Sequence, residues 1–297
     1  MATRKLGAAL AAGCTTILKP AEQTPLTAAA LVEVLHEAGV PDGVLNLIPT
    51  TAPAVQSSAL MTEPRLRKIS VTGSTQVGST LLGQAARHIV AASMELGGNA
   101  PFLVLADADV DVDVDAAVAG AMVAKFRNGG QSCVAANRFI VHRAVVERFT
   151  DAFVARASDL CLDRKDGEPD IGPLIDQRQL QRVEWLVDDA VSRGARVHCG
   201  ARTAATAGFF YYPTVLTDVP DDAAMHREEI FGPVAPVIVV DSDDEAVQCG
   251  NDTEYGLAAF VYSQDVDRAS MSPNDSKPAW SASTEASFPR SPRPSVA

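Results

Sequence analysis

The stretch Lys68-Ile69-Ser70-Val71-Thr72-Gly73-Ser74-Thr75-Gln76-Val77-Gly78 is typical of a strand that passes through a glycine into a helix. The first turn of such a helix leaves backbone N–H groups free, and these suit a phosphate group. The spacing approaches the nucleotide-binding loop G-x-x-x-x-G-K-[ST], but Ser79 stands where that loop has its lysine. The stretch therefore favours a diphosphate over a nucleoside triphosphate.

The residues around this stretch repeat the alternation of strand and helix. We expect a strand at 15–18, a helix from Pro25 (behind a Thr24 N-cap) to Gly39, a strand at 44–48, a helix at 54–61, a strand at 68–72 and a helix after Gly73. This order predicts an α/β domain with a mostly parallel βαβ sheet. No G-x-G-x-x-G is present, so a dinucleotide would bind in a variant manner.

A second α/β region follows the first. It comprises strand-like segments on both sides of Glu95, helices at 115–126, 145–160 and 179–192, and strands at 138–141, near Val215 and at 234–240. Two α/β regions in sequence fit a cofactor domain followed by a catalytic domain. We expect the first to cover residues 1–96 and the second residues 97–269.

The composition changes after Ala269. The 28 residues from Ser270 to Ala297 include eight Ser and five Pro but no Ile or Leu. Such a segment buries too little apolar surface to offset the entropy of ordering it. Residues 270–297 are therefore predicted to be disordered.

Composition and charge exclude several classes of partner. A chain that is 47% hydrophobic and 21% charged is typical of a soluble globular protein, and a net charge of −12 argues against nucleic acid. The five cysteines contain no C-x-x-C pair, which favours a reducing compartment. Residues 1–14 resemble a lipoprotein export signal, but their apolar run is short and a strand follows it. No apolar run has the length of a membrane span, so a cytoplasmic location is expected.

No metal site is predicted. The five histidines form no i, i+4 pair and lie beside no cysteine at metal-ligand spacing. Alternating aspartates from Asp107 to Asp115 resemble a calcium loop, but no register supplies its glycine and its final glutamate. This run is interpreted as a solvated, helix-capping acidic segment.

Cys133 is the candidate nucleophile. It follows Asn128-Gly-Gly-Gln-Ser132, and glycines give a reactive sulfur backbone room; simple burial of a small residue is the alternative. Glu95, 38 positions earlier in Met94-Glu-Leu-Gly-Gly98, offers a carboxylate base. If the fold brings the two together, a thiolate that attacks a carbonyl and a carboxylate that activates water form a coherent pair.

Five segments together resemble the aldehyde dehydrogenase superfamily. They are Ala12-Gly-Cys-Thr-Thr-Ile-Leu-Lys-Pro-Ala-Glu-Gln-Thr-Pro25, Thr72-Gly-Ser-Thr-Gln-Val-Gly78, Met94-Glu-Leu-Gly-Gly98, Gly130-Gln-Ser-Cys133 and Glu228-Glu-Ile-Phe-Gly-Pro233. The ordered match spans roughly residues 8 to 269. It implies an incomplete Rossmann-like cofactor domain followed by an α/β catalytic domain, with Cys133 as the nucleophile and Glu95 as the general base.

The resemblance also assigns cofactor contacts. It implies that Gly73 and Ser74 form the pyrophosphate loop, that Lys19 and Glu22 contact the adenine ribose, and that the nicotinamide end meets Glu229 and Phe231. A carboxylate at Glu22 would bind ribose hydroxyls and repel a 2′-phosphate, which favours NAD over NADP. The positive charge of Lys19 would attract a 2′-phosphate and therefore favours NADP.

Within the superfamily, Lys125-Phe-Arg-Asn-Gly-Gly-Gln-Ser-Cys133 is most similar to succinate-semialdehyde dehydrogenases. Arg127 matches the arginine that binds the distal carboxylate of their substrate, a task that suits a permanently charged, bidentate guanidinium. An ordinary surface ion pair is the alternative role for Arg127, and glutarate semialdehyde is a competing substrate.

The ends of the chain depart from the family pattern. The resemblance implies a preceding segment, with the first strand of the cofactor sheet and an asparagine of the oxyanion hole, and a following assembly strand. We therefore expect a chain shortened at its start and aberrant after Ala269. Two alternatives to aldehyde oxidation stay open: an inactive fragment, and a dehydrogenase that transfers the acyl group to CoA. The family's homo-oligomeric assembly would lack its C-terminal strand here.

Overall fold

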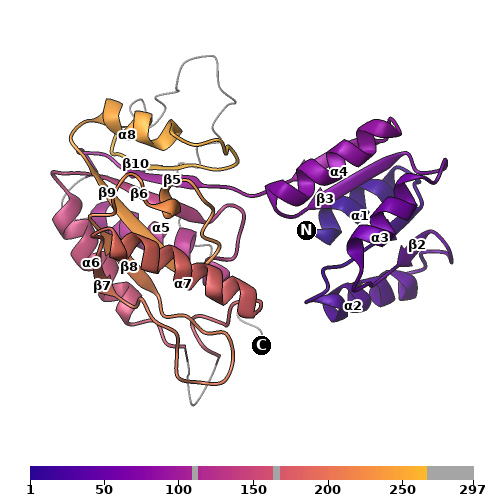
Figure 1. Ribbon diagram of the computed structural model, residues 1–297, viewed down its shortest axis with the longest axis horizontal. Coiled ribbons are helices and arrows are strands. Elements are labelled where there is room, and N and C mark those ends of the chain that lie inside the picture. Colours follow the sequence, from indigo (N-terminus) through magenta and orange to yellow (C-terminus); the bar gives the residue numbers. More distant parts are fainter. Residues whose placement is uncertain (109–112, 163–167, 266–297) are drawn as a thin grey trace, which may run out of the picture. The chain divides into compact units, whose positions relative to one another are not determined.

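The computed structural model describes residues 1–108, 113–162 and 168–265, and these form two compact units. The units are Met1–Gly97 and Gly98–Ala297, and each is described by itself (Figure 1). Their division lies one residue after the expected boundary at residue 96. The tail predicted to be disordered and the middle of the aspartate run lie outside the described residues.

The first unit repeats strand and helix along its length. Its elements are α1 (Ala2–Ala11), β1 (Thr16–Leu18), α2 (Pro25–Glu37), β2 (Leu45–Leu47), α3 (Pro53–Met61), β3 (Lys68–Thr72), α4 (Thr75–Arg87) and β4 (Ala91–Glu95). Thr24 is the N-cap residue of α2 and Pro25 its first residue, as expected, although the Thr24 side chain makes no capping bond. The residues compared with an export signal form helix α1, whose Leu6 is buried.

The strands of the first unit pair in parallel, as expected, but they form two ladders instead of a single βαβ sheet. In the part of the chain that the structure describes, β1 pairs with β2 and β3 pairs with β4, both in parallel, as two separate ladders. A βαβ sequence pattern makes its own two strands parallel, but it does not determine whether neighbouring units share backbone hydrogen bonds.

The second unit is built on a six-stranded sheet. Its elements are β5 (Ala100–Val104), α5 (Asp113–Phe126), η1 (Arg127–Gly130), β6 (Ala136–His142), α6 (Val146–Ser158), α7 (Gln177–Ser192), β7 (Arg196–Cys199), β8 (Thr214–Thr217), η2 (Ala224–His226), β9 (Val234–Val240), α8 (Asp243–Asn251) and β10 (Phe260–Tyr262). The strand order is β10-β5-β6-β9-β8-β7, with β7 antiparallel to β8 and all other neighbours parallel. The α/β class is therefore confirmed, with β7, α8 and β10 added to the predicted elements.

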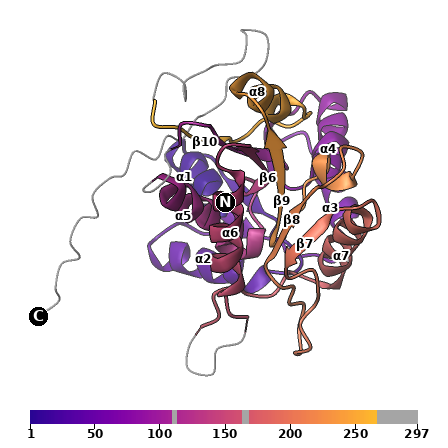
Figure 2. The ribbon, with the colours of Figure 1, turned by 90° about the vertical axis from the view of Figure 1, so that its left-hand side faces the viewer.

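Helices cover both faces of this sheet (Figures 1 and 2). On one face, Phe102 and Phe139 pack with Phe149 and Phe153 of α6, with ring centroids between 5.1 and 6.5 Å apart. On the other face, alternate strand residues such as Ile140 pack against Ala246 of α8, as the period of two along a strand requires. Two-sided burial explains why β5 is apolar throughout and why the centre of β6, from Phe139 to Val141, is apolar.

Among the described residues, no helix combines the length and the apolar character needed to cross a membrane. In the same ranges, no three His, Cys, Asp or Glu side chains gather closely enough to hold a metal ion.

Candidate active site

Cys133 lies in a tight loop between α5 and β6. The loop begins with η1, in which Asn128, Gly129 and Gly130 have φ angles of +54°, +63° and +74°. Three consecutive left-handed residues reverse the chain sharply, and glycine adopts this conformation without steric cost. Cys133 follows three residues later and is half-buried. The glycines before the cysteine are therefore a requirement of the backbone.

Two glycines hold this loop against distant parts of the second unit. A Cβ on Gly130 would overlap the carbonyl oxygen of Gly232, and a Cβ on Gly98 would overlap the carbonyl oxygen of Cys133. Both sites permit a backbone approach that only glycine allows. Segments that begin near residues 98, 130 and 232 thus meet around the cysteine.

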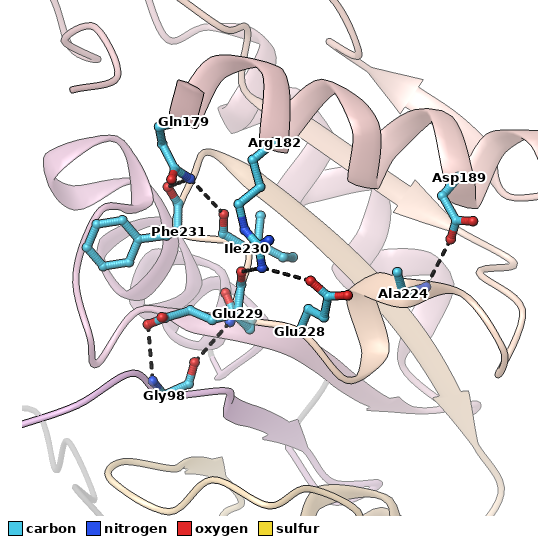
Figure 3. Close-up of polar contacts among 10 residues, drawn as sticks. Gly98, Gln179, Arg182, Asp189, Ala224, Glu228, Glu229, Ile230 and Phe231 are labelled. Carbon is cyan, nitrogen blue, oxygen red and sulfur yellow. Dashed lines mark hydrogen bonds and ion pairs between the residues drawn. The ribbon is translucent and has the colours of Figure 1, made fainter. Parts of the chain in front are cut away.

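Glu229 reaches the same place through the peptide of Gly98. Its Oε1 accepts a hydrogen bond from the Gly98 backbone N–H at 3.1 Å (Figure 3). Burial raises the pKa of Glu229 above its ordinary value, while the Gly98 bond and the charges of Arg182 and Lys125 act to lower it. One peptide therefore contacts both the cysteine backbone and the Glu229 carboxylate.

Helix α7 braces the segment that carries Phe231. Gln179 Nε2 donates hydrogen bonds to the carbonyl oxygens of Ile230, at 3.2 Å, and Phe231, at 2.9 Å (Figure 3). Arg182 donates to the Glu228 carboxylate at 2.8 Å and to the carbonyl of the following residue at 3.2 Å. Phe231 has a φ of +50°, which is uncommon for a bulky residue and needs such support.

Sequence reasoning missed Gln179 and Arg182. Neither belongs to a recognised motif, and their partners lie about 50 positions away along the chain. Residues three apart lie on the same face of a helix, so the predicted helix at 179–192 already placed Gln179 and Arg182 side by side. That shared face is the one sequence signal that could have identified them.

Arg127 lines a hollow beside the cysteine loop. The hollow has a volume of about 160 Å³ and an otherwise largely apolar lining that includes Ser132 and Val134, the two neighbours of Cys133, together with Phe260 of β10. Arg127 is exposed, and in the described residues it forms no ion pair. Its guanidinium is therefore available to an anion.

Lys125 is fully buried one residue before the end of α5. Its Nζ donates hydrogen bonds to the Ala136 carbonyl oxygen at 2.9 Å and to Asn137 Oδ1 at 3.2 Å. Burial lowers its pKa from 10.5 to about 7, against the opposing effect of the Glu229 charge.

The first unit contains the remaining predicted residues. Ser74 caps α4 by accepting a hydrogen bond from the Val77 N–H at 3.3 Å. The Gly73 N–H donates to the Glu95 carbonyl oxygen at 3.1 Å, so the loop before α4 is tied to the end of β4. The Leu96 side chain packs directly against Gly78, so a Cβ there would require that side chain to shift.

Lys19 and Glu22 form an ion pair at 2.9 Å in the first unit. The hydrogen bond from Lys19 lowers the pKa of Glu22, so its carboxylate is ionised at neutral pH. The predicted residues thus fall into two groups: Lys19, Glu22, Gly73, Ser74 and Glu95 in the first unit, and Arg127, Cys133, Glu229 and Phe231 in the second.

Comparison with known proteins shows the family of the chain. A family model described as the aldehyde dehydrogenase family matches residues 1–276. The chain is 48% identical over 269 residues to a succinate-semialdehyde dehydrogenase of Paenarthrobacter nicotinovorans, covering 90% of this chain and 59% of that protein. It is 47% identical to an NADP(+) succinate-semialdehyde dehydrogenase of Escherichia coli, with 90% and 55% covered, and 45% identical to a glutarate-semialdehyde dehydrogenase of Pseudomonas aeruginosa, also with 90% and 55% covered.

Solved structures are similar over the same extent. A succinate-semialdehyde dehydrogenase from Burkholderia pseudomallei superposes with a TM-score of 0.85 at 43% identity, covering 90% of this chain and 54% of that one. An NAD+ complex of an aldehyde dehydrogenase from Bacillus cereus superposes with a TM-score of 0.84 at 39% identity, with 91% and 54% covered. The chain therefore spans little more than half the length of the relatives it matches.

Replacing Gln179 by Leu should loosen the Phe231 segment. The change leaves the Ile230 and Phe231 carbonyl oxygens without their donor, which should cost about 1–3 kcal/mol of unfolding free energy. Hydrogen exchange should rise at residues 230–232 more than in the sheet. Gln181→Leu, an exposed neighbour on the same helix, is the matched control. Equal exchange in both variants would contradict the bracing role.

Lys125 should make stability depend on pH. Because its folded pKa of about 7 lies below its ordinary 10.5, the unfolded chain binds more protons between these values, and the free energy of unfolding should increase as pH rises through this range. The gain from about pH 7 to about pH 9 is at most about 2–3 kcal/mol. Urea titrations should show this increase in wild type and in Lys68→Met, an exposed control, and lose it in Lys125→Met.

Proposed function

Because the chain belongs to the aldehyde dehydrogenase family, we propose that it catalyses the NAD(P)-dependent oxidation of an aldehyde to a carboxylate, with Cys133 as the nucleophile. One observation carries the proposal. The Gly98 peptide packs on the Cys133 carbonyl and bonds to Glu229, so three segments that carry predicted site residues meet at the cysteine.

The chemistry at Cys133 begins with its thiolate. The sulfur forms a bond to the aldehyde carbon, and the carbonyl oxygen takes up negative charge. Loss of a hydride from this tetrahedral adduct leaves a thioester on Cys133. A bound dinucleotide would be the hydride acceptor.

Glu95 is proposed as the base that completes the reaction. Its carboxylate takes a proton from water, whose oxygen then attacks the thioester carbon. The carbon–sulfur bond breaks, the carboxylate product departs, and Cys133 returns to the thiolate. The bond from Gly73 to the Glu95 carbonyl fixes the backbone of this residue at the end of β4.

The chain's donor and acceptor groups fit a dinucleotide. The capped N-terminus of α4, at Ser74, suits the diphosphate, and the Glu229 carboxylate suits ribose hydroxyls. Glu22 disfavours a 2′-phosphate, but Lys19 pairs with it at 2.9 Å and offsets its charge. Matched relatives include an NADP(+) enzyme and an NAD+ complex. The activity of the chain should therefore be measured with NAD and with NADP.

We propose a semialdehyde with a distal carboxylate as the substrate, succinate semialdehyde before glutarate semialdehyde. Arg127 faces a hollow bordered by both neighbours of Cys133 and has no ion-pair partner in the described residues. A guanidinium there would bind the distal carboxylate while the aldehyde meets the sulfur. Matched relatives include enzymes named for each of the two substrates.

Turnover by the chain tests the proposal. Incubation with succinate semialdehyde and either NAD or NADP should give reduced cofactor and succinate, and Cys133→Ala should abolish both. Cys161→Ala, an exposed cysteine of the same unit, should retain activity. Acyl-CoA formed on addition of CoA would instead identify an acylating enzyme, and folded protein without turnover would contradict aldehyde oxidation by this chain.

Arg127→Gln tests the substrate class. The variant should raise KM for succinate semialdehyde by about 10–100-fold, which corresponds to the loss of a charge-assisted hydrogen bond. Butanal, which has the same carbon chain and no carboxylate, should be oxidised equally well by both proteins. Arg178→Gln, an exposed arginine of the same unit, is the control. If Arg127→Gln impaired the oxidation of succinate semialdehyde and of butanal equally, carboxylate recognition by Arg127 would be ruled out.

A further inference from the structure

Lys125 lies in the core of the second unit, where an ammonium group is costly to bury. Its side chain is 0% exposed, although lysine is among the residue types least often buried. Neither the proposed chemistry nor the proposed cofactor contacts use it. Its hydrogen bonds indicate what it does.

The Lys125 ammonium joins the two ends of the cysteine loop. The residue lies on the last turn of α5, before the loop, whereas its acceptors Ala136 and Asn137 lie at the start of β6, after it. The bonds at 2.9 and 3.2 Å span 11 and 12 positions of sequence, and Cys133 lies between the partners. The neutral amine would keep two N–H donors for the same two acceptors.

Asn137 extends this link to the centre of the site. Its Nδ2 donates to the Gly98 carbonyl oxygen at 3.3 Å, and the Gly98 N–H donates to Glu229 at 3.1 Å. The Cα of the same glycine lies against the Cys133 carbonyl. A continuous chain of hydrogen bonds therefore runs from Lys125 through Asn137 and Gly98 to Glu229, and it passes the cysteine.

We propose that Lys125 is a positioning residue, a buried clasp that closes the Cys133 loop and, through Asn137 and Gly98, sets the place of Glu229. The relevance of the clasp to catalysis rests on the proposed role of Cys133, but its action on the loop does not. A long apolar side chain could fill the same volume, so packing alone does not require an amine here.

Cysteine alkylation separates a clasp from simple core filling. Wild type, Lys125→Met and Lys125→Arg are treated with iodoacetamide, and the rates at Cys133 and Cys199 are measured by peptide mass spectrometry. Cys199 is held in β7 of the same unit by a bond to the Pro213 carbonyl, and it reports general loosening. Met keeps the length of the side chain but removes its donors, whereas Arg keeps donors and crowds the core.

Lys125→Met should raise the Cys133 rate about tenfold with little change at Cys199, since tenfold corresponds to about one lost hydrogen bond. In Lys125→Arg, Cys133 should be alkylated as slowly as in wild type, even though this substitution lowers the free energy of unfolding. An unchanged or slower Cys133 rate in Lys125→Met, an equal rise at Cys199, or no rescue by Arg would overturn the proposal.

Asn137→Ala provides a second, milder test. It cuts the link to Gly98 and leaves the bond between Lys125 and Ala136 in place, so the Cys133 rate should rise by about threefold, less than in Lys125→Met. A Cys133 rate equal to wild type would refute the relay through Asn137. Because alkylation needs neither aldehyde nor dinucleotide, failure of the clasp is distinguishable from failure of the proposed oxidation.

Discussion

The arrangement around Cys133 depends on one peptide, that of Gly98, which is held on three sides. Its carbonyl accepts from Asn137, its N–H donates to Glu229, and its Cα lies against the carbonyl of Cys133. Any side chain at this position would displace the cysteine loop, so the absence of a Cβ is what allows the site to form. The tight loop of three left-handed residues then determines the direction in which the chain passes Cys133.

Buried charge shapes the surroundings of this peptide. Lys125 is fully buried and Glu229 is half-buried, and burial shifts their pKa values in opposite directions, lowering that of the lysine and raising that of the glutamate. Each charge favours the ionised form of the other, although neither attraction cancels the cost of desolvation. Lys125 and Gly98 therefore contact the cysteine loop or its ends, and both also influence the pKa of Glu229.

Sequence patterns predicted most of the elements and few of the contacts. The strand at 68–72 and the helix ending at Met61 were confirmed because local apolar periodicity and proline placement determine them. Helix α7 was predicted, but Gln179 and Arg182 were not identified as braces, since their partners are the backbone of a distant segment. From the sequence, Lys125 was named only as the first residue of the segment Lys125–Cys133 and was given no role. Burial of a lysine depends on tertiary packing, which no local sequence pattern reveals.

The backbone N–H of Gly73 has a different partner from the one that its sequence motif indicates. The sequence links it to a phosphate-binding loop, yet its N–H is bonded to the Glu95 carbonyl. A diphosphate at this helix would therefore rely on other free N–H groups of the first turn of α4, with Ser74 holding that turn through Val77. In this view Gly73 contributes by joining the end of β3 to the end of β4, so that the proposed diphosphate-binding turn and the proposed base both lie at the end of one parallel ladder.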